Sequence, residues 1–325
     1  MMKTIFRQVI VMLLGALASF QSPLLYGQSS GGAFLKIDHS ARSYAMGQSG
    51  VVSAMGAEAI GANPANLMEL GRKTELMTAY SSLTDGASYG HIAGAVNRSA
   101  GSDRMVDAIG FSYTRVAVDG IEGRDGSGNK TADYGSQDSQ MSLSAGGNIG
   151  KVKLGVTGKL VQSKIGEYKA NTVFAGDMGL SYGFKGLGRD MKAGLSVNNL
   201  GQGQRYLNQQ DPLPTAMHLG LETHAGPMNL TGGLSQQLKG EGTAMNFGME
   251  FNMGIVSLRA GVNAFGGRKG NKSSGGVSSL FEGLSSGLGL NLGMARVDYA
   301  LGQESADLGI SHRMSLTFQF GKQSR

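Results

Sequence analysis

The histidines and cysteines, which often carry metal or nucleophilic chemistry, set a first limit on what this chain does. Five histidines occur: His39, His91, His218, His224 and His312. No two of them have the spacing of a pair of metal ligands with a carboxylate between. The chain has no cysteine, so thiol catalysis and thiolate metal sites are excluded. We therefore expect no metal, no cofactor and no enzyme activity.

Two stretches look like ligand-binding motifs but lack essential positions. Loop 125–133 has oxygen-bearing side chains at alternate positions, as a calcium loop does. However, Lys130 stands in place of the required glycine and Ser136 in place of the bidentate glutamate. The glycines of 287–293 are not followed by a helix, on which phosphate binding would depend. The simpler interpretation of 125–133 is a solvated loop, and that of 287–293 is a strand.

A larger set of charged and polar residues falls on every second position of alternating stretches. In 245–253 and 314–320, Met, Phe and Leu alternate with small or polar residues. A period of two places the two kinds of side chain on opposite faces of a strand. The polar face of such strands carries Asp177, His218, Glu222, Glu250, Arg259, Arg296, Asp298 and Arg313. Structural ion pairs are the favoured role for these charges, with a substrate path as the alternative.

The strands that would position these residues follow one another from about residue 76 to the C-terminus, with almost no helix-period stretch between. They are expected at 74–82, 88–98, 105–118, 138–149, 151–164, 171–185, 190–200, 215–224, 226–238, 242–253, 254–265, 283–292, 293–303 and 307–321. Strands with one apolar and one polar face predict an all-β fold, a transmembrane antiparallel β-barrel of about 14 strands. The polar set then faces the lumen, since a Lys or Arg facing lipid near the midplane would cost about 2–4 kcal/mol. His312 breaks the pattern and is expected near a membrane interface.

The lengths of the connections support this strand count. The three longest, 119–137, 201–214 and 266–281, follow the third, seventh and eleventh strands. Short turns at Gly150, 225–226, Gly254 and Gly293 follow the fourth, eighth, tenth and twelfth. A barrel with both ends in the periplasm has long outer loops after odd strands and short turns after even ones.

The N-terminal segment predicts export. Lys3 and Arg7 precede the apolar run 9–18, and small residues follow, with cleavage expected after Gly27. No later stretch reaches 18 consecutive apolar residues. We therefore assign 1–27 as a signal peptide and expect the mature chain in the outer membrane.

Residues 28–72 differ from the strands that follow. Small residues dominate 51–62, and the alanine-rich middle favours a short helix. Pro64 keeps Asn63 out of the α region, so a break is expected there. The segment is too small to form its own core, so we expect a plug inside the barrel, with a periplasmic tail as the alternative. The expected division is therefore plug 28–72, barrel 73–321 and a short tail 322–325.

Ordered blocks along the mature chain carry a family resemblance. They are Phe34-Leu35-Lys36-Ile37, the Ala41-Arg42 to Met46-Gly47 block, Asn63-Pro64-Ala65, 177–182, 195–201, 213–214, 258–261, 298–300 and 312–316. Together they resemble the PorV/PorQ family of outer-membrane proteins, itself related to FadL-type barrels. The resemblance implies a fourteen-stranded barrel with Arg42, Gly47, Asn63, Pro64 and Ala65 in the plug. The C-terminus departs from many such barrels, because 321–325 follow the aromatic Phe320.

The resemblance implies two different functions. PorV/PorQ proteins serve type IX secretion, so the expected partners are outer-membrane lipid, secretion components and exported proteins. FadL-type relatives instead let hydrophobic small molecules cross the membrane. The few apolar residues assigned to the lumen tell mildly against such a channel, and a purely structural barrel is a third possibility. Nucleic acid is not expected, because the basic residues behind the net charge of +6 are dispersed.

Overall fold

The computed structural model describes residues 31–83, 86–98, 106–206, 209–239, 242–266, 283–305 and 309–323. The predicted signal peptide and nearly all of the predicted loop 266–281 lie outside these residues. Within them, no helix is long and apolar enough to cross a membrane.

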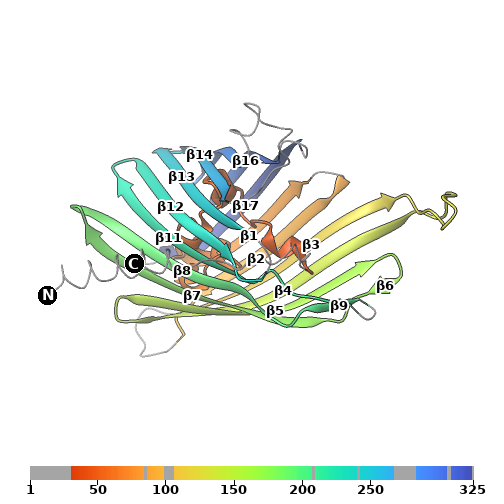
Figure 1. Ribbon diagram of the computed structural model, residues 1–325. Coiled ribbons are helices and arrows are strands. Elements are labelled where there is room, and N and C mark those ends of the chain that lie inside the picture. Colours follow the sequence, from red (N-terminus) through yellow and green to blue (C-terminus); the bar gives the residue numbers. More distant parts are fainter. Residues whose placement is uncertain are drawn as a thin grey trace.

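Fourteen long antiparallel strands close into a barrel (Figure 1). They are β1 (Arg72–Ser82), β2 (Ser88–Asn97), β3 (Ala108–Ile121), β4 (Tyr134–Ile149), β5 (Val152–Ile165), β7 (Val173–Gly186), β8 (Arg189–Gly201), β11 (Ala216–Ala225), β12 (Met228–Gln237), β13 (Thr243–Met253), β14 (Val256–Gly266), β15 (Leu284–Asn291), β16 (Ala295–Ser305) and β17 (Gly309–Gln323). Each pairs with its neighbours along the chain, and the ring is completed where β1 pairs with β17. The predicted barrel and its strand number are confirmed.

Three further strands in the described part of the chain were not predicted. They are β6 (Tyr168–Lys169), β9 (Gln204–Tyr206) and β10 (Gln209–Asp211). β6 pairs with the end of β5, whereas β9 and β10 form a small separate hairpin between β8 and β11. All three are short and polar, so no period of two marks them.

The connections lie at two ends of the barrel. The loop end carries those after β3 and β8, and the turn end carries the short turns after β4, β7, β11 and β13. Gly150, Gly226 and Gly254 have positive φ in these turns, a conformation that glycine adopts readily. The predicted loop 119–137 is partly wrong, because Val118 still pairs with Ser136 and Ile121 with Tyr134. The β3–β4 hairpin therefore projects past the neighbouring strands (Figure 1).

The alternation of side chains separates the outer face from the lumen. On β13, Met245 and Phe247 are 53% and 54% exposed. Asn246 between them and Glu250 further along the strand are buried. β17 follows the same rule, with Met314, Phe318 and Phe320 outside. His312 also lies on the outer face of β17, where its Nδ1 is 2.7 Å from the hydroxyl of Tyr299.

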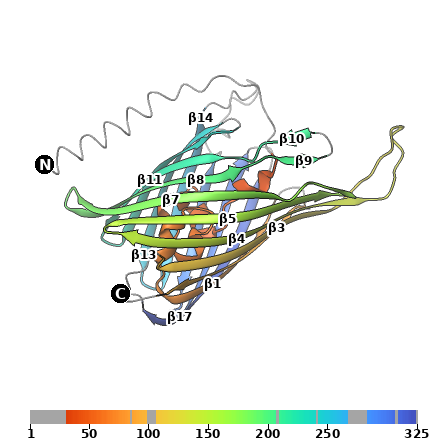
Figure 2. The same cartoon turned by 90° about the horizontal axis from the view of Figure 1, so that it is seen from below.

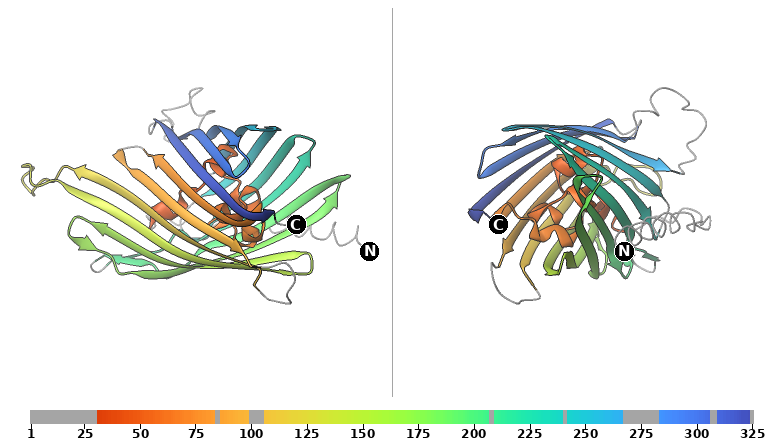
Figure 3. Two further views of the ribbon diagram at one scale, coloured as in Figure 1. Left: turned by 180° about the vertical axis from the view of Figure 1, so that it is seen from behind. Right: turned by 90° about the vertical axis from the view of Figure 1, so that its left-hand side faces the viewer.

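Inside the barrel lies a chain of five short helices (Figures 2 and 3). They are η1 (Ala33–Lys36), α2 (Ala41–Ala45), α3 (Gly50–Ser53), η2 (Gly56–Ala59) and η3 (Pro64–Met68). The Ser40 side chain caps α2, and Asn63 caps η3 with Pro64 in the first position, where a missing N–H costs nothing. We call residues 31–70 the plug. It runs from η1 at the loop end to β1, which starts at the turn end.

Candidate functional site: the plugged lumen

The wall of the barrel meets the plug through a row of glycines, which we call the glycine girdle. Its members are Gly146, Gly155, Gly179, Gly194, Gly220, Gly248, Gly261 and Gly287. Several are direct cross-strand neighbours, such as Gly146 with Gly155 and Gly155 with Gly179. A Cβ on seven of them would come within 3.0 Å of a plug or wall atom, which real Cβ atoms essentially never do; at Gly146 the plug lies slightly farther away. The missing side chains therefore let the plug backbone lie directly on the wall.

Four of the residues that the PorV/PorQ resemblance assigned to the plug lie in this contact. A Cβ on Gly155 would clash with Pro64 and Ala65, and one on Gly179 with Asn63. The Asn63 side chain also donates to the carbonyl of Val51 at 2.9 Å. Gly47, with φ +68°, accepts a hydrogen bond from Asn246 of β13 at 2.7 Å. At these positions the plug and the wall are in direct contact.

The first charged cluster joins the plug to β13, β14 and β16. Arg42 reaches Glu250 with Nε 2.8 Å from Oε2, and Glu250 also meets Arg259 at 2.7 Å. Arg259 continues to Asp298 at 2.8 Å, as does Arg296. Arg296 pairs in turn with Glu58 of the plug, whose other oxygen lies 3.9 Å from Arg42. Three guanidinium groups thus alternate with three carboxylates in the interior.

A second cluster lies at the turn end of the lumen. Glu69 of the plug pairs with Lys153 at 2.7 Å and with Lys192 at 2.9 Å. Lys192 also contacts Glu222 at 2.7 Å, and Glu222 accepts a hydrogen bond from Asn229 at 2.6 Å. Two lysines are therefore matched by two carboxylates.

A third, isolated pair lies toward the loop end. Lys159 of β5 and Asp177 of β7 are 2.8 Å apart, and both side chains are almost completely buried. Beside them β8 has a bulge, in which Asn199 takes φ +60° and donates its N–H to Asp177 at 2.8 Å. Asn198, the neighbouring residue, donates to the plug carbonyls of Gly61 and Ala62. The bulge thus turns two successive side chains toward the interior.

For Arg42 and Glu69 of the plug, burial and the ion pairs shift the pKa in opposite directions. Burial alone would lower the pKa of Arg42, but the carboxylates of Glu250 and Glu58 raise it. Burial alone would raise the pKa of Glu69, but Lys192 and Lys153 hold it below its usual range. Burial, followed by the charges of His91 and Lys159, lowers the pKa of His39 well below its ordinary value. These pKa shifts favour the charged forms of Arg42 and Glu69 and the neutral form of His39.

His39, His91, His218 and Arg313 make contacts inside the barrel. The His39 ring stacks on His91 with centroids 4.6 Å apart, and its Nδ1 bonds the hydroxyl of Tyr89. His218 of β11 is half-buried, with Nδ1 2.8 Å from the Ser235 hydroxyl. Arg313 of β17 donates to the plug carbonyl of Asp38 at 3.0 Å and lies over the ring of Tyr44.

An apolar cluster lies at the loop end of the lumen, beside the Lys159–Asp177 pair. Phe34 and Leu35 of η1 pack there against a wall patch, and we call the whole set the loop-end cluster: Phe34, Leu35, Tyr89, Val116, Val161, Val173, Ala175 and Leu213. Ile37 and Leu83 pack at its edge. The plug thus supplies two large apolar side chains at this level. A second apolar cluster lies where the plug meets β1, β2 and β3, with Ile60 and Leu67 from the plug and Met77 from the wall.

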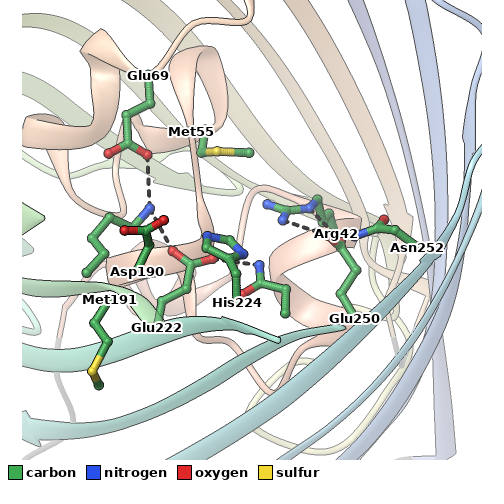
Figure 4. A pocket seen from close by; sticks show the side chains of 11 residues that line it. Arg42, Met55, Glu69, Asp190, Met191, Glu222, His224, Glu250 and Asn252 are labelled. Atoms are coloured by element: carbon green, nitrogen blue, oxygen red, sulfur yellow. Dashed lines mark hydrogen bonds and ion pairs between the residues drawn. The ribbon is translucent and has the colours of Figure 1, made fainter. Parts of the chain in front are cut away.

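The turn end instead contains an open cavity of about 350 Å³ (Figure 4). Its upper wall is the plug, through Arg42, Met55 and Glu69, and its other walls come from strands β8, β11, β12 and β13. Those strands contribute Asp190, Met191, Lys192, Glu222, His224, Asn229, Glu250 and Asn252. We call this the turn-end cavity. It is charged, in contrast to the loop-end cluster.

The structure places all eight charged and polar residues assigned from alternation on the lumen side. Glu250, Arg259, Arg296 and Asp298 meet in the first cluster, whereas Glu222 belongs to the second. Asp177, His218 and Arg313 lie apart from both clusters.

Sequence reasoning missed five ionic partners. Lys153, Lys159 and Lys192 lie on the inward phase of β5 and β8, so the same alternation could have found them. Glu58 and Glu69 lie in the irregular plug, where no period indicates which way a side chain points. Within the described residues, no group of three or more His, Asp or Glu could hold a metal ion.

Comparisons with known proteins bear on the fold. A scan against protein-family models and a search of curated proteins find no match. Among solved structures, the chain is similar to the toluene transporter TodX of P. putida, with 12% identity and a TM-score of 0.51 over 82% of this chain and 95% of TodX. A deltaS2 mutant of TodX, described as a monoaromatic hydrocarbon channel, gives the same values over 85% and 99%. The outer membrane protein Omp33 of Acinetobacter baumannii has 10% identity and a TM-score of 0.42 over 77% and 99%. The barrel architecture is thus shared with TodX, while membership of the PorV/PorQ family is not shown.

Proposed function

We propose that this protein is an outer-membrane channel for hydrophobic small molecules, with the short turns in the periplasm and the long loops outside. The observation that carries the proposal is the loop-end cluster. Five strand residues and Leu213 of the β10–β11 connection form an apolar patch at the loop end, and the plug covers it with Phe34 and Leu35. An apolar molecule that enters from the loop end would find its burial surface there by displacing these two side chains.

The barrel shared with TodX supports this proposal, because a TodX structure is described as that of a toluene transporter. The glycine girdle affects the path that a small molecule could take past the plug. It brings the plug into direct contact with the wall on β4, β5, β7, β8, β11, β13, β14 and β15, so passage along these strands would require the plug or the wall to move.

Uptake of radiolabelled toluene by cells that make the full-length protein tests the proposal. Val161 lies in the loop-end cluster, and Val156 lies on the outer face of the same strand. Val161→Thr keeps the shape but places a hydroxyl in the apolar patch, so it should reduce uptake. Val156→Thr makes the same change outside the lumen and should leave uptake unaltered. Uptake no faster than in cells with an empty vector contradicts the proposal.

The secretion role implied by the PorV/PorQ resemblance stays a prediction. The projecting β3–β4 hairpin is a surface that a protein partner could reach (Figure 1). Mild detergent extraction followed by identification of co-purified proteins tests that role, and the absence of secretion components or cargo would argue against it.

A further inference from the structure

Three basic side chains lie together on the outer face of the barrel, at its loop end. Arg115 of β3 has the same phase as the exposed Phe111, and Lys164 of β5 has the same phase as the exposed Leu160. Lys169 of β6 is the direct cross-strand partner of Lys164, so the two side chains leave the sheet on the same face. All three basic side chains are exposed, and we call them the basic row.

Gln137 of β4 connects Arg115 with Lys164. It is the register partner of Lys164, and its Oε1 accepts a hydrogen bond from Nη2 of Arg115 at 2.9 Å. Strands β3, β4, β5 and β6 are consecutive neighbours in the sheet, at the end where the β3–β4 hairpin projects (Figure 1). The basic row therefore crosses four neighbouring strands with a neutral amide at its centre.

No carboxylate of the described residues forms an ion pair with the basic row. Glu122 pairs instead with the basic side chains of the β3–β4 connection. Glu167 in the turn between Lys164 and Lys169, and Asp119 further along β3, are both exposed and outside ion-pair distance of the row. Like charges that lie directly opposite each other on a sheet are destabilising. A bound anion would offset this repulsion.

The surface on the barrel side of the basic row is apolar. Large side chains on β3, β4, β5 and β7 are between 40% and 76% exposed there: Phe111, Met141, Leu143, Leu160 and Phe174. In a membrane-spanning barrel such an outer band faces the acyl chains of the lipids. The polar headgroups lie at the edge of the hydrocarbon region, which is the level of the basic row.

We propose that the basic row binds the phosphate group of an anionic membrane lipid, whose acyl chains lie on this apolar band. The Arg115 guanidinium offers a planar set of N–H donors that fits phosphate oxygens, and Lys164 and Lys169 act as point charges. Free phosphate would meet the same cations without the apolar band, and salt screens exposed charges, so a lipid is the favoured source. The surface lies outside the lumen, so this proposal goes beyond the proposed channel and does not depend on transport.

Native mass spectrometry of the purified full-length protein, released from detergent, tests the proposal. Dioleoylphosphatidic acid is the probe. Dioleoylphosphatidylcholine, which has the same acyl chains but no net charge, is its counterpart. The phosphatidic acid should bind saturably and more tightly than the phosphatidylcholine, and inorganic phosphate at the same concentration should not displace it.

Lys164→Gln and Lys169→Gln should each weaken phosphatidic acid binding about fivefold, because one cation near an anionic membrane surface contributes about that much. Gln137→Glu places a carboxylate at the centre of the basic row with little change of shape, so it should also weaken binding. Lys164→Arg keeps the charge and should bind as the parent does. Lys130→Gln is the matched control, because it removes a loop-end charge that Glu122 already offsets at 3.4 Å, and it should leave binding unchanged.

Three results would overturn the proposal: equal binding of the two lipids, displacement of the lipid by inorganic phosphate, or equal binding by Lys164→Gln and Lys130→Gln. The changed side chains are all exposed, and the mobility shift between heated and unheated samples on a gel checks that each variant is folded. Toluene uptake reports on the lumen, so either result can fail without the other.

Discussion

Arg42 of the plug and Glu250 of β13 form a two-point ion pair, although 208 residues separate them in the chain. Arg42 Nε lies 2.8 Å from Oε2 of Glu250, and Nη2 lies 3.1 Å from Oε1. Arg259 of β14 meets the same carboxylate at 2.7 Å. The carboxylate therefore holds one guanidinium from the plug and one from the wall, and it joins the two parts of the molecule.

Replacing Glu250 by Gln should loosen the plug and destabilise the barrel. The change leaves Arg42 and Arg259 buried with one compensating charge fewer, and the loss of one partner from a buried ion pair costs about 3–5 kcal/mol. The urea midpoint of the detergent-solubilised protein measures the loss.

Glu122→Gln is the matched control for Glu250→Gln. Glu122 pairs with Arg124 and Lys130 at an exposed position in the β3–β4 connection, where ion pairs contribute about 0–1 kcal/mol. Equal midpoints for the two variants would mean that the Arg42–Glu250 pair does not hold the plug.

Gly155→Ala should prevent normal assembly. The added methyl group would meet the plug backbone at Pro64 and Ala65, and backbone cannot move aside as a flexible side chain can. The folded fraction, measured by the mobility shift between heated and unheated samples on a gel, should fall strongly.

Gly158 provides the comparison for Gly155 on the same strand. It lies on the outer face of β5, and a Cβ there meets no atom within 4 Å. Gly158→Ala should fold as the parent does. If both alanine variants fold equally well, the glycine girdle is not needed for docking of the plug.

The wall of the barrel could be predicted because a physical rule marks it at every second residue. One face of each strand is apolar and exposed and the other lines the interior, so β13 was expected at 242–253 and lies at Thr243–Met253. The alternation of apolar and polar side chains weakens where strands extend beyond the loop end of the barrel. β3 was expected to end at 118 but continues to Ile121, where the hairpin projects and neither face needs to be apolar.

The interior contacts could be predicted only on the wall side. Arg296 and Asp298 share a face because they are two residues apart on a strand, and they pair at 2.8 Å. Their plug partner Glu58 lies 238 residues from Arg296 in a segment of short helices, where no period fixes the direction of a side chain. The turn-end cavity depends on how that segment folds back on β8, β11 and β12, so local patterns cannot locate it.

Acid should weaken the second ionic cluster through Glu69. Lys192 and Lys153 hold the pKa of the Glu69 carboxyl below its usual range, despite its burial. A carboxyl with a lowered pKa in the folded state adds stability above the ordinary glutamate pKa of about 4.3, and that stability is lost as the pH falls through the folded-state value. Glu69→Gln should therefore lower the urea midpoint at pH 7, and the difference in urea midpoint between variant and parent should narrow below about pH 4.

Glu167→Gln, an exposed change near the loop end, should leave the urea midpoint unchanged at both pH values. If the difference in urea midpoint between Glu69→Gln and the parent stays constant or widens on acidification, the lysines do not stabilise the plug through Glu69.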